Sequence, residues 1–117
     1  MTTSQRLRVL LVKPYQHSTS HTICQPPLGL LYLASALRRY FGRQVEVACR
    51  DMRLYKETPE EVAAETAGRY DLVGISALNC EADAAHSLAR AVRALAPATV
   101  LALGGPYARS SPAQAAE

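Results

Sequence analysis

The amino-acid sequence predicts an α/β fold, in which one parallel β-sheet is covered by helices on both faces. Short apolar runs alternate with stretches of helical periodicity four times along the chain, and this alternation is typical of β-α-β units with right-handed crossovers. At 117 residues the chain can bury one core, because domains usually contain roughly 100–150 residues. We therefore expect residues 1–117 to form one doubly wound sheet of the Rossmann or flavodoxin-like type, with strand order 2-1-3-4.

Four apolar or alternating runs predict the strands. The first is nearly continuous, as expected of a strand that is covered on both faces, and Pro14 ends it. In the second, Val45 and Val47 alternate with polar residues, which indicates a strand near an edge of the sheet. The predicted strands are Leu7–Val12, Gln44–Cys49, Leu72–Ser76 and Thr99–Leu103.

Periodicity and cap residues predict the helices. The first is expected at Leu28–Phe41, the second begins at Thr58-Pro59-Glu60-Glu61, which has the residues of a capping box, and the third spans about Glu81–Leu95. The apolar face of the first comprises Leu30, Leu33, Ala34, Leu37 and Phe41. Ser111-Pro112 is another helix start, so we expect a C-terminal truncation inside an element, with the last strand or strands of the sheet missing.

Ligands of such sheets bind beyond the carboxyl ends of the strands, where the strand order reverses. In a 2-1-3-4 order this point lies between the first and third strands. The long segment Pro14–Pro27 and the segment Ser76–Asn79 both follow strands at that point. Connections of this length are often functional, so we expect the binding site there.

Composition and charge exclude several classes. The net charge of +3 is too small to indicate nucleic-acid binding without clustered basic residues. No apolar run approaches the roughly 20 residues that cross a bilayer, and the N-terminus lacks the layout of a signal peptide. Cys24, Cys49 and Cys80 have no CxxC spacing, which favours a reducing compartment. We expect a cytoplasmic protein without membrane or nucleic-acid partners, capable of self-association through an unpaired sheet edge.

Four segments carry a resemblance to a known family. They are Val9–Pro14, Pro26–Ala34, Asp71–Leu78 and Leu103–Tyr107. In this order and spacing they resemble the N-terminal cobalamin (B12)-binding domain of B12-dependent radical-SAM enzymes. In such domains a Ser-x-Leu follows the third strand and a Gly-Gly the fourth, which Ser76-Ala77-Leu78 and Gly104-Gly105 match.

The resemblance implies that the nucleotide tail of cobalamin lies between strand ends and helices. A serine hydroxyl can hydrogen-bond the benzimidazole of the tail, and glycines leave room for it. It therefore implies the following cofactor-binding residues: Tyr15, Leu28, Gly29, Ser76, Ala77, Leu78, Asn79, Gly104, Gly105 and Pro106.

Two family motifs are absent. The DxHxxG loop that follows the first strand in many cobalamin-binding domains is replaced by Lys13, Tyr15 and Ser18, which resembles the radical-SAM branch, where the histidine ligand of cobalt is commonly lacking. There is also no CxxxCxxC motif to hold an iron–sulfur cluster. We thus expect no catalytic residue or protein metal ligand here. S-adenosylmethionine and a 4Fe-4S cluster would belong to a missing or separate radical-SAM domain, in cis or in trans, and the complete protein would be a methyltransferase or a related enzyme.

Other classes remain open. The same fold without a cofactor would be a non-enzymatic interaction module. The cluster Ser18-Thr19-Ser20-x-Thr22 could bind the phosphate of FMN, although it lacks the glycine of such loops. His17, His21 and Cys24 are zinc-ligand types, but their setting between prolines favours a polar loop.

Overall fold

The structure is a computed structural model in which residues 6–16 and 26–116 are described. In these residues four parallel strands form one sheet of order β2-β1-β3-β4, so the predicted α/β fold and strand order are confirmed. The strands are β1 (Leu7–Lys13), β2 (Val45–Asp51), β3 (Leu72–Ser76) and β4 (Val100–Gly104).

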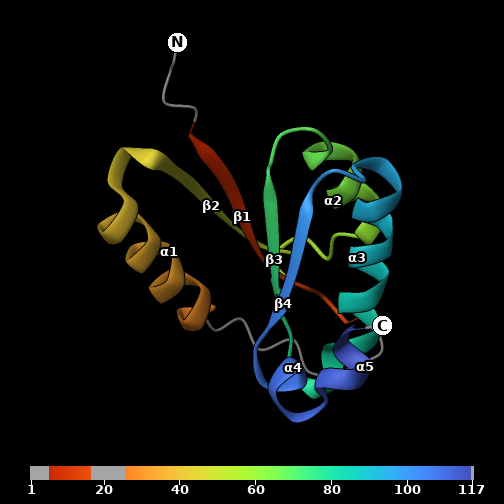
Figure 1. Cartoon of the computed structure of the whole chain (residues 1–117). Helices are drawn as coiled ribbons and strands as arrows, with labels where there is room; N and C mark the ends of the chain where they lie inside the picture. The colour runs from red at the N-terminus through yellow and green to blue at the C-terminus, as the bar shows by residue number, and fades with distance from the viewer. Residues whose placement is uncertain (1–5, 17–25, 117) are drawn as a thin grey trace.

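Helices cover both faces of the sheet (Figure 1). α1 lies on one face, against β2 and β1, while α2 and α3 pack together on the other. The helices are α1 (Leu28–Phe41), α2 (Pro59–Thr66), α3 (Ala82–Leu95), α4 (Pro106–Ser110) and α5 (Pro112–Ala116), with short 3-10 helices at Gly42–Gln44 and Asn79–Glu81.

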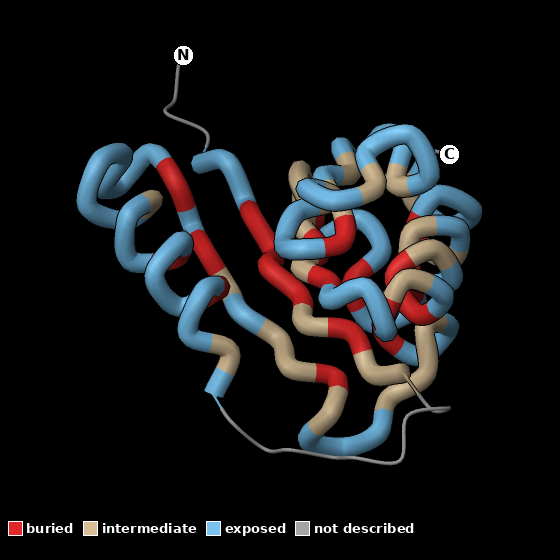
Figure 2. The backbone as a smooth tube through the Cα atoms, turned by 90° about the horizontal axis from the view of Figure 1, so that it is seen from below, coloured by how far each residue is buried: buried red, intermediate tan, exposed pale blue. Residues whose placement is uncertain are grey.

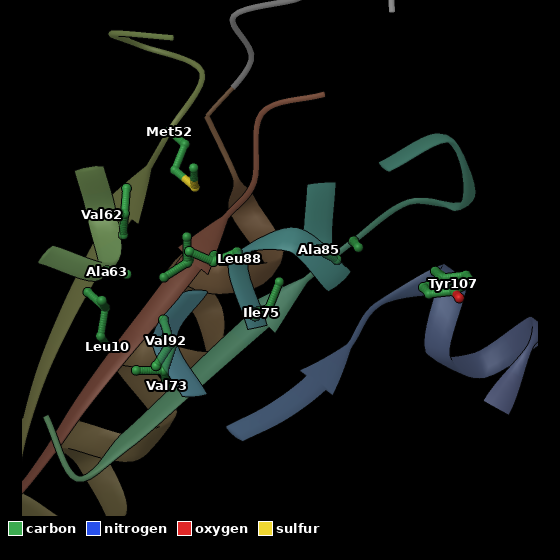
Figure 3. Packing of buried hydrophobic residues seen from close by; sticks show 12 residues of the cluster. Leu10, Met52, Val62, Ala63, Val73, Ile75, Ala85, Leu88, Val92 and Tyr107 are labelled. Atoms are coloured by element: carbon green, nitrogen blue, oxygen red, sulfur yellow. The ribbon is translucent and has the colours of Figure 1, made fainter. Parts of the chain in front are cut away.

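The larger core lies between the sheet and α2 and α3 (Figure 3). Leu10 and Val12 of β1 point into it, since alternate residues of a strand face the same side, and Leu88 of α3 meets them at 0% exposure. Thr58 and Glu61 form the predicted capping box, because each accepts a hydrogen bond from the other's backbone N–H. The residues of this capping box therefore fix where α2 begins.

The smaller core lies between α1 and the other face of the sheet. Leu30 and Ala34 are buried there against Val9 and Leu11, as the helical periodicity predicted. Leu33 and Phe41 belong to the same predicted apolar face and line one groove with Leu30, but they are 53% and 51% exposed. They lie beside the part of the sheet that α1 does not cover, and Figure 2 shows α1 exposed over most of its circumference.

The C-terminal part of the chain differs from the prediction at one point. The sequence pattern predicted no helix between Leu103 and Ser111, but α4 begins directly at Pro106. Proline suits the first turn of a helix because its missing N–H would have no helical partner there. As a result the loop between β4 and α4 is a single residue, Gly105.

Candidate functional site

The carboxyl ends of β3 and β4 are joined by backbone hydrogen bonds. Ser76 and Gly104 are paired across the two strands. The N–H of Ala77 donates to the carbonyl oxygen of Gly104 at 3.1 Å, and the N–H of Tyr107 donates to the carbonyl oxygen of Ala77 at 3.1 Å. The Ser-x-Leu and Gly-Gly segments therefore form one hydrogen-bonded unit. The sequence predicted that both lie at the same edge of the sheet but not that they contact each other.

Gly105 is required by the geometry of this unit. Its φ of +86° lies in a region that side chains strongly disfavour. A Cβ at this position would lie 2.9 Å from the carbonyl oxygen and 3.0 Å from the nitrogen of Ala77, and 3.0 Å from Oγ of Ser76. Only glycine lets the two segments approach so closely.

A groove of about 520 Å³ lies between α1 and the sheet. Its volume is within the range of small-molecule sites, roughly 300–1,000 Å³. The lining is overwhelmingly apolar, and its residues come from α1, β1 and the two strands whose ends carry the predicted motifs. They include Leu11, Leu30, Leu33, Leu37, Phe41, Gly74, Ser76, Ala102, Gly104 and Gly105.

Small side chains make the floor of this groove. Gly74 pairs with Ala102, and Ser76 pairs with Gly104, so all four lie on the same face of the sheet. A Cβ on Gly74 would lie 3.0 Å from the end of the Leu11 side chain. The groove exists because β3 and β4 carry no bulky residue on this face over Gly74–Ser76 and Ala102–Gly104, and among residues 6–16 and 26–116 no helix covers this face of the two strands.

The predicted cofactor-binding residues fall into three groups. Ser76, Gly104 and Gly105 line the groove. The second group, Ala77 and Tyr15, lies outside this lining and packs in or against the larger core. The third group is exposed at strand or helix ends and comprises Leu28, Gly29, Leu78, Asn79 and Pro106. Asn79 receives a hydrogen bond from the hydroxyl of Ser110 in α4 at 3.0 Å.

Sequence reasoning missed an ion pair at the same edge. Nζ of Lys13, at the end of β1, lies 2.5 Å from Oε1 of Glu81, and both side chains are about nine-tenths buried. The same oxygen accepts the N–H of Leu78 at 2.8 Å. The sequence gave no indication of this pair, because the partners are 68 positions apart.

Asp51, at the end of β2, belongs to the same row of charges. Burial alone would raise the pKa of Asp51, but hydrogen bonds from the side chain and backbone of Arg53, with the charges of Arg53 and Lys13, outweigh it. The pKa of Asp51 therefore lies below its usual value. Ionised groups thus alternate in sign along the carboxyl ends of β2 and β1.

A second cavity, of about 830 Å³, lies on the opposite face of the sheet between α3, β4 and the C-terminal helices. His86 and Tyr107 meet there, with Nε2 and the hydroxyl oxygen 2.9 Å apart. The sequence did not predict it.

The alternative sites of the first loop cannot be located. His17, His21 and Cys24, and the Ser/Thr cluster at 18–22, lie outside the described residues. Elsewhere in the described chain no group of three potential metal ligands occurs, and Cys49 and Cys80 are free and exposed. Nor does any helix of the described part have the length and apolar character needed to span a membrane.

The fold is an open parallel α/β sheet, and the groove extends along one face of it from Leu7, Val45 and Leu72, where strands begin, to Ser76 and Gly104, where strands end. The comparison with family models is specific about the ligand. The model of the B12 binding domain matches residues 20–117, and the chain belongs to this family. No curated protein and no solved structure matches the chain.

Proposed function

We propose that this chain binds cobalamin with the nucleotide tail in the groove between α1 and the carboxyl halves of β3 and β4. Membership of the B12-binding family gives the ligand, and the position within the fold is the proposal. The observation that carries it is the groove itself, because Ser76, Gly104 and Gly105 line its end at the carboxyl ends of β3 and β4, which we call the mouth of the groove. Those are the residues that the family resemblance assigns to the tail.

The groove residues suit a flat, largely apolar group with a few polar atoms. Leu30, Leu33 and Leu37 of α1 offer an aliphatic wall, and the floor of Gly74 and Ala102 admits a ring close to the backbone. Ser76 is the polar side chain of the lining at the end of β3, and its hydroxyl can donate to a ring nitrogen. The residues present therefore fit the benzimidazole part of the cofactor.

The exposed residues of the same edge form the rim of the proposed site. We assign Leu78, Asn79 and Pro106 to the nucleotide side of the rim, and Leu28 and Gly29 to the start of α1. Tyr15 follows β1 and packs against the larger core. In this proposal it contributes packing below the corrin ring and is not a ligand of cobalt.

The complete protein, in this proposal, is a B12-dependent radical-SAM methyltransferase or a related enzyme. Bound methylcobalamin would supply a transferable methyl group. This chain would bind and orient the corrinoid, and a radical-SAM domain in cis or in trans would hold S-adenosylmethionine and the 4Fe-4S cluster. The support is the Pro-Pro-Leu-Gly entry to α1 together with the Ser-x-Leu and Gly-Gly segments, in the order of that branch.

Titration of the full chain with hydroxocobalamin, followed by its visible spectrum, tests the site. Ala102→Phe places a ring on the floor of the groove, whereas Val100→Phe places the same ring on the same strand and face, two residues away and outside the groove lining. We expect Ala102→Phe to weaken binding at least 10-fold and Val100→Phe to change it less than 3-fold.

Failure of the folded wild-type chain to retain corrinoid would overturn the proposal, and equal effects of the two substitutions would overturn the position of the tail. Binding of FMN in a parallel titration would favour the flavodoxin-like alternative.

A further inference from the structure

One charged contact crosses the point where the strand order reverses. Lys13 ends β1, and Glu81 ends the 3-10 helix Asn79–Glu81 that follows the Ser-x-Leu segment. Their side chains are 11% and 8% exposed, with Nζ and Oε1 2.5 Å apart. A pair so shielded from water is costly to leave incomplete, because either partner alone would be a buried charge.

Glu81 connects this charge to the backbone of the turn. Its Oε1 accepts the N–H of Leu78 at 2.8 Å, and its own N–H donates to the carbonyl oxygen of Leu78 at 2.9 Å. One residue therefore holds Leu78 through both its N–H and its carbonyl oxygen. Ala77, the neighbour of Leu78 in the chain, is hydrogen-bonded to Gly104 and Tyr107. A shift of Leu78 would therefore also disturb the β3–β4 unit at the mouth of the groove.

A second contact runs parallel to the first. Oε1 of Gln16 accepts the N–H of Ala84 in the first turn of α3 at 2.9 Å. Lys13 and Gln16, at and after the end of β1, thus contact two points of the segment from Glu81 to Ala84 that leads into α3. Asp51 lies beside Lys13 in the adjacent strand, but its ion pair is with Arg53, at 2.7 Å. The ion pair of Lys13 is with Glu81.

We propose that Lys13 and Glu81 are positioning residues of the cobalamin site. The pair fixes the Ser76–Leu78 turn relative to β1, so that the mouth of the groove is formed before the ligand arrives. Preorganisation of this kind increases affinity by removing an ordering cost from binding. The inference rests on the proposed function, and it gives Lys13 a role in a chain that lacks the DxHxxG loop.

The test uses a double variant that removes both charges without leaving either one buried alone. Lys13→Met with Glu81→Gln keeps an acceptor for the Leu78 N–H but removes the attraction to β1. Arg50→Met with Glu57→Gln is the matched control, because Arg50 and Glu57 form another partly buried ion pair, between β2 and the start of α2. Lys13→Arg retains the positive charge and should therefore retain the affinity for hydroxocobalamin.

Two measurements separate positioning from general stability. We expect hydroxocobalamin to bind the Lys13/Glu81 double variant about 10-fold more weakly at 25 °C, while the control pair and Lys13→Arg stay within 3-fold of the wild type. Without ligand, hydrogen exchange followed by NMR should show the amides of Ala77 and Leu78 exchanging about 10-fold faster in the double variant. The control pair should leave both amides unchanged.

Unaltered exchange at Ala77 and Leu78 would overturn the positioning role whether or not the chain binds cobalamin. Equal loss of affinity in the control pair would also overturn it, because the effect would then follow stability alone. A wild-type chain that binds no corrinoid, with faster exchange in the double variant, would refute the proposed function and leave the ion pair as the anchor of the turn.

Discussion

Substitution of Gly105 by alanine tests the geometry of the site directly. The change adds one Cβ in a residue whose φ is +86° and ψ is −175°, a region that is essentially restricted to glycine and costs about 1–3 kcal/mol for other residues. The Cβ would also lie 2.9–3.0 Å from two backbone atoms of Ala77 and from Oγ of Ser76. Because backbone atoms cannot rotate away, the turn itself must shift, and overpacking of this kind costs about 1–3 kcal/mol.

The two contributions together predict a loss of about 3 kcal/mol in the free energy of unfolding. For a domain of this size that lowers Tm by about 10 °C, which thermal and urea unfolding followed by circular dichroism would measure. Gly68→Ala separates the contributions, because Gly68 has a φ of +76° but no atom within 4 Å of its Cβ position, and should cost about 1–2 kcal/mol.

Gly104→Ala is the second control. No atom lies within 4 Å of that Cβ position, so stability should change by less than about 0.5 kcal/mol. If Gly105→Ala unfolds no more easily than Gly68→Ala, the close approach of the two segments is not a property of the folded protein, and the reasoning is refuted.

Four further predictions follow from other contacts. Ser76→Ala should weaken hydroxocobalamin binding about 3- to 10-fold, the value of one hydrogen bond, with unchanged Tm. The pKa of Asp51 is lower in the folded than in the unfolded chain, so the ionised carboxylate stabilises the fold above pH ~4, and this stabilisation is lost as the pH falls through the folded pKa. The urea midpoint should therefore fall between pH 5 and pH 3, and Arg53→Met should make this fall smaller. Thr58→Ala, which removes the cap of α2, should cost about 1 kcal/mol in urea unfolding. Val100→Lys should suppress any concentration-dependent association seen by sedimentation velocity, because a charge on an edge strand disfavours strand pairing.

The strands and their order could be predicted because each strand is encoded locally. Leu72–Ser76 is a short β-branched run, and the structure gives the same limits. α1 also has the predicted limits, Leu28–Phe41, because its apolar periodicity is continuous and Gly42 follows it. The handedness of crossovers restricts the possible strand orders, and the order 2-1-3-4 is the one that the flavodoxin-like type of doubly wound sheet has.

The ion pair and the exposed side of α1 could not be predicted, for a physical reason. Lys13 and Glu81 are charged residues in segments that predict a strand end and a helix start, and nothing local distinguishes a buried partner from a solvated one. Similarly, periodicity places Leu33 and Phe41 on the apolar face of α1 but does not show whether the sheet opposite is covered. Such features depend on which elements meet in three dimensions.

The exposure of Leu33 and Phe41 and the proposed binding site have the same structural origin. A helix whose apolar face is wider than its contact with the sheet leaves large side chains at the border, here 53% and 51% exposed. The floor beside them carries Gly74 and Ala102, so the helix has nothing to pack against over β3 and β4. Exposed apolar surface of this kind costs solvation free energy, and in the proposed function a bound apolar ring would offset that cost at Leu33 and Phe41. The exposed apolar side of α1 therefore supports the proposed position of the ligand.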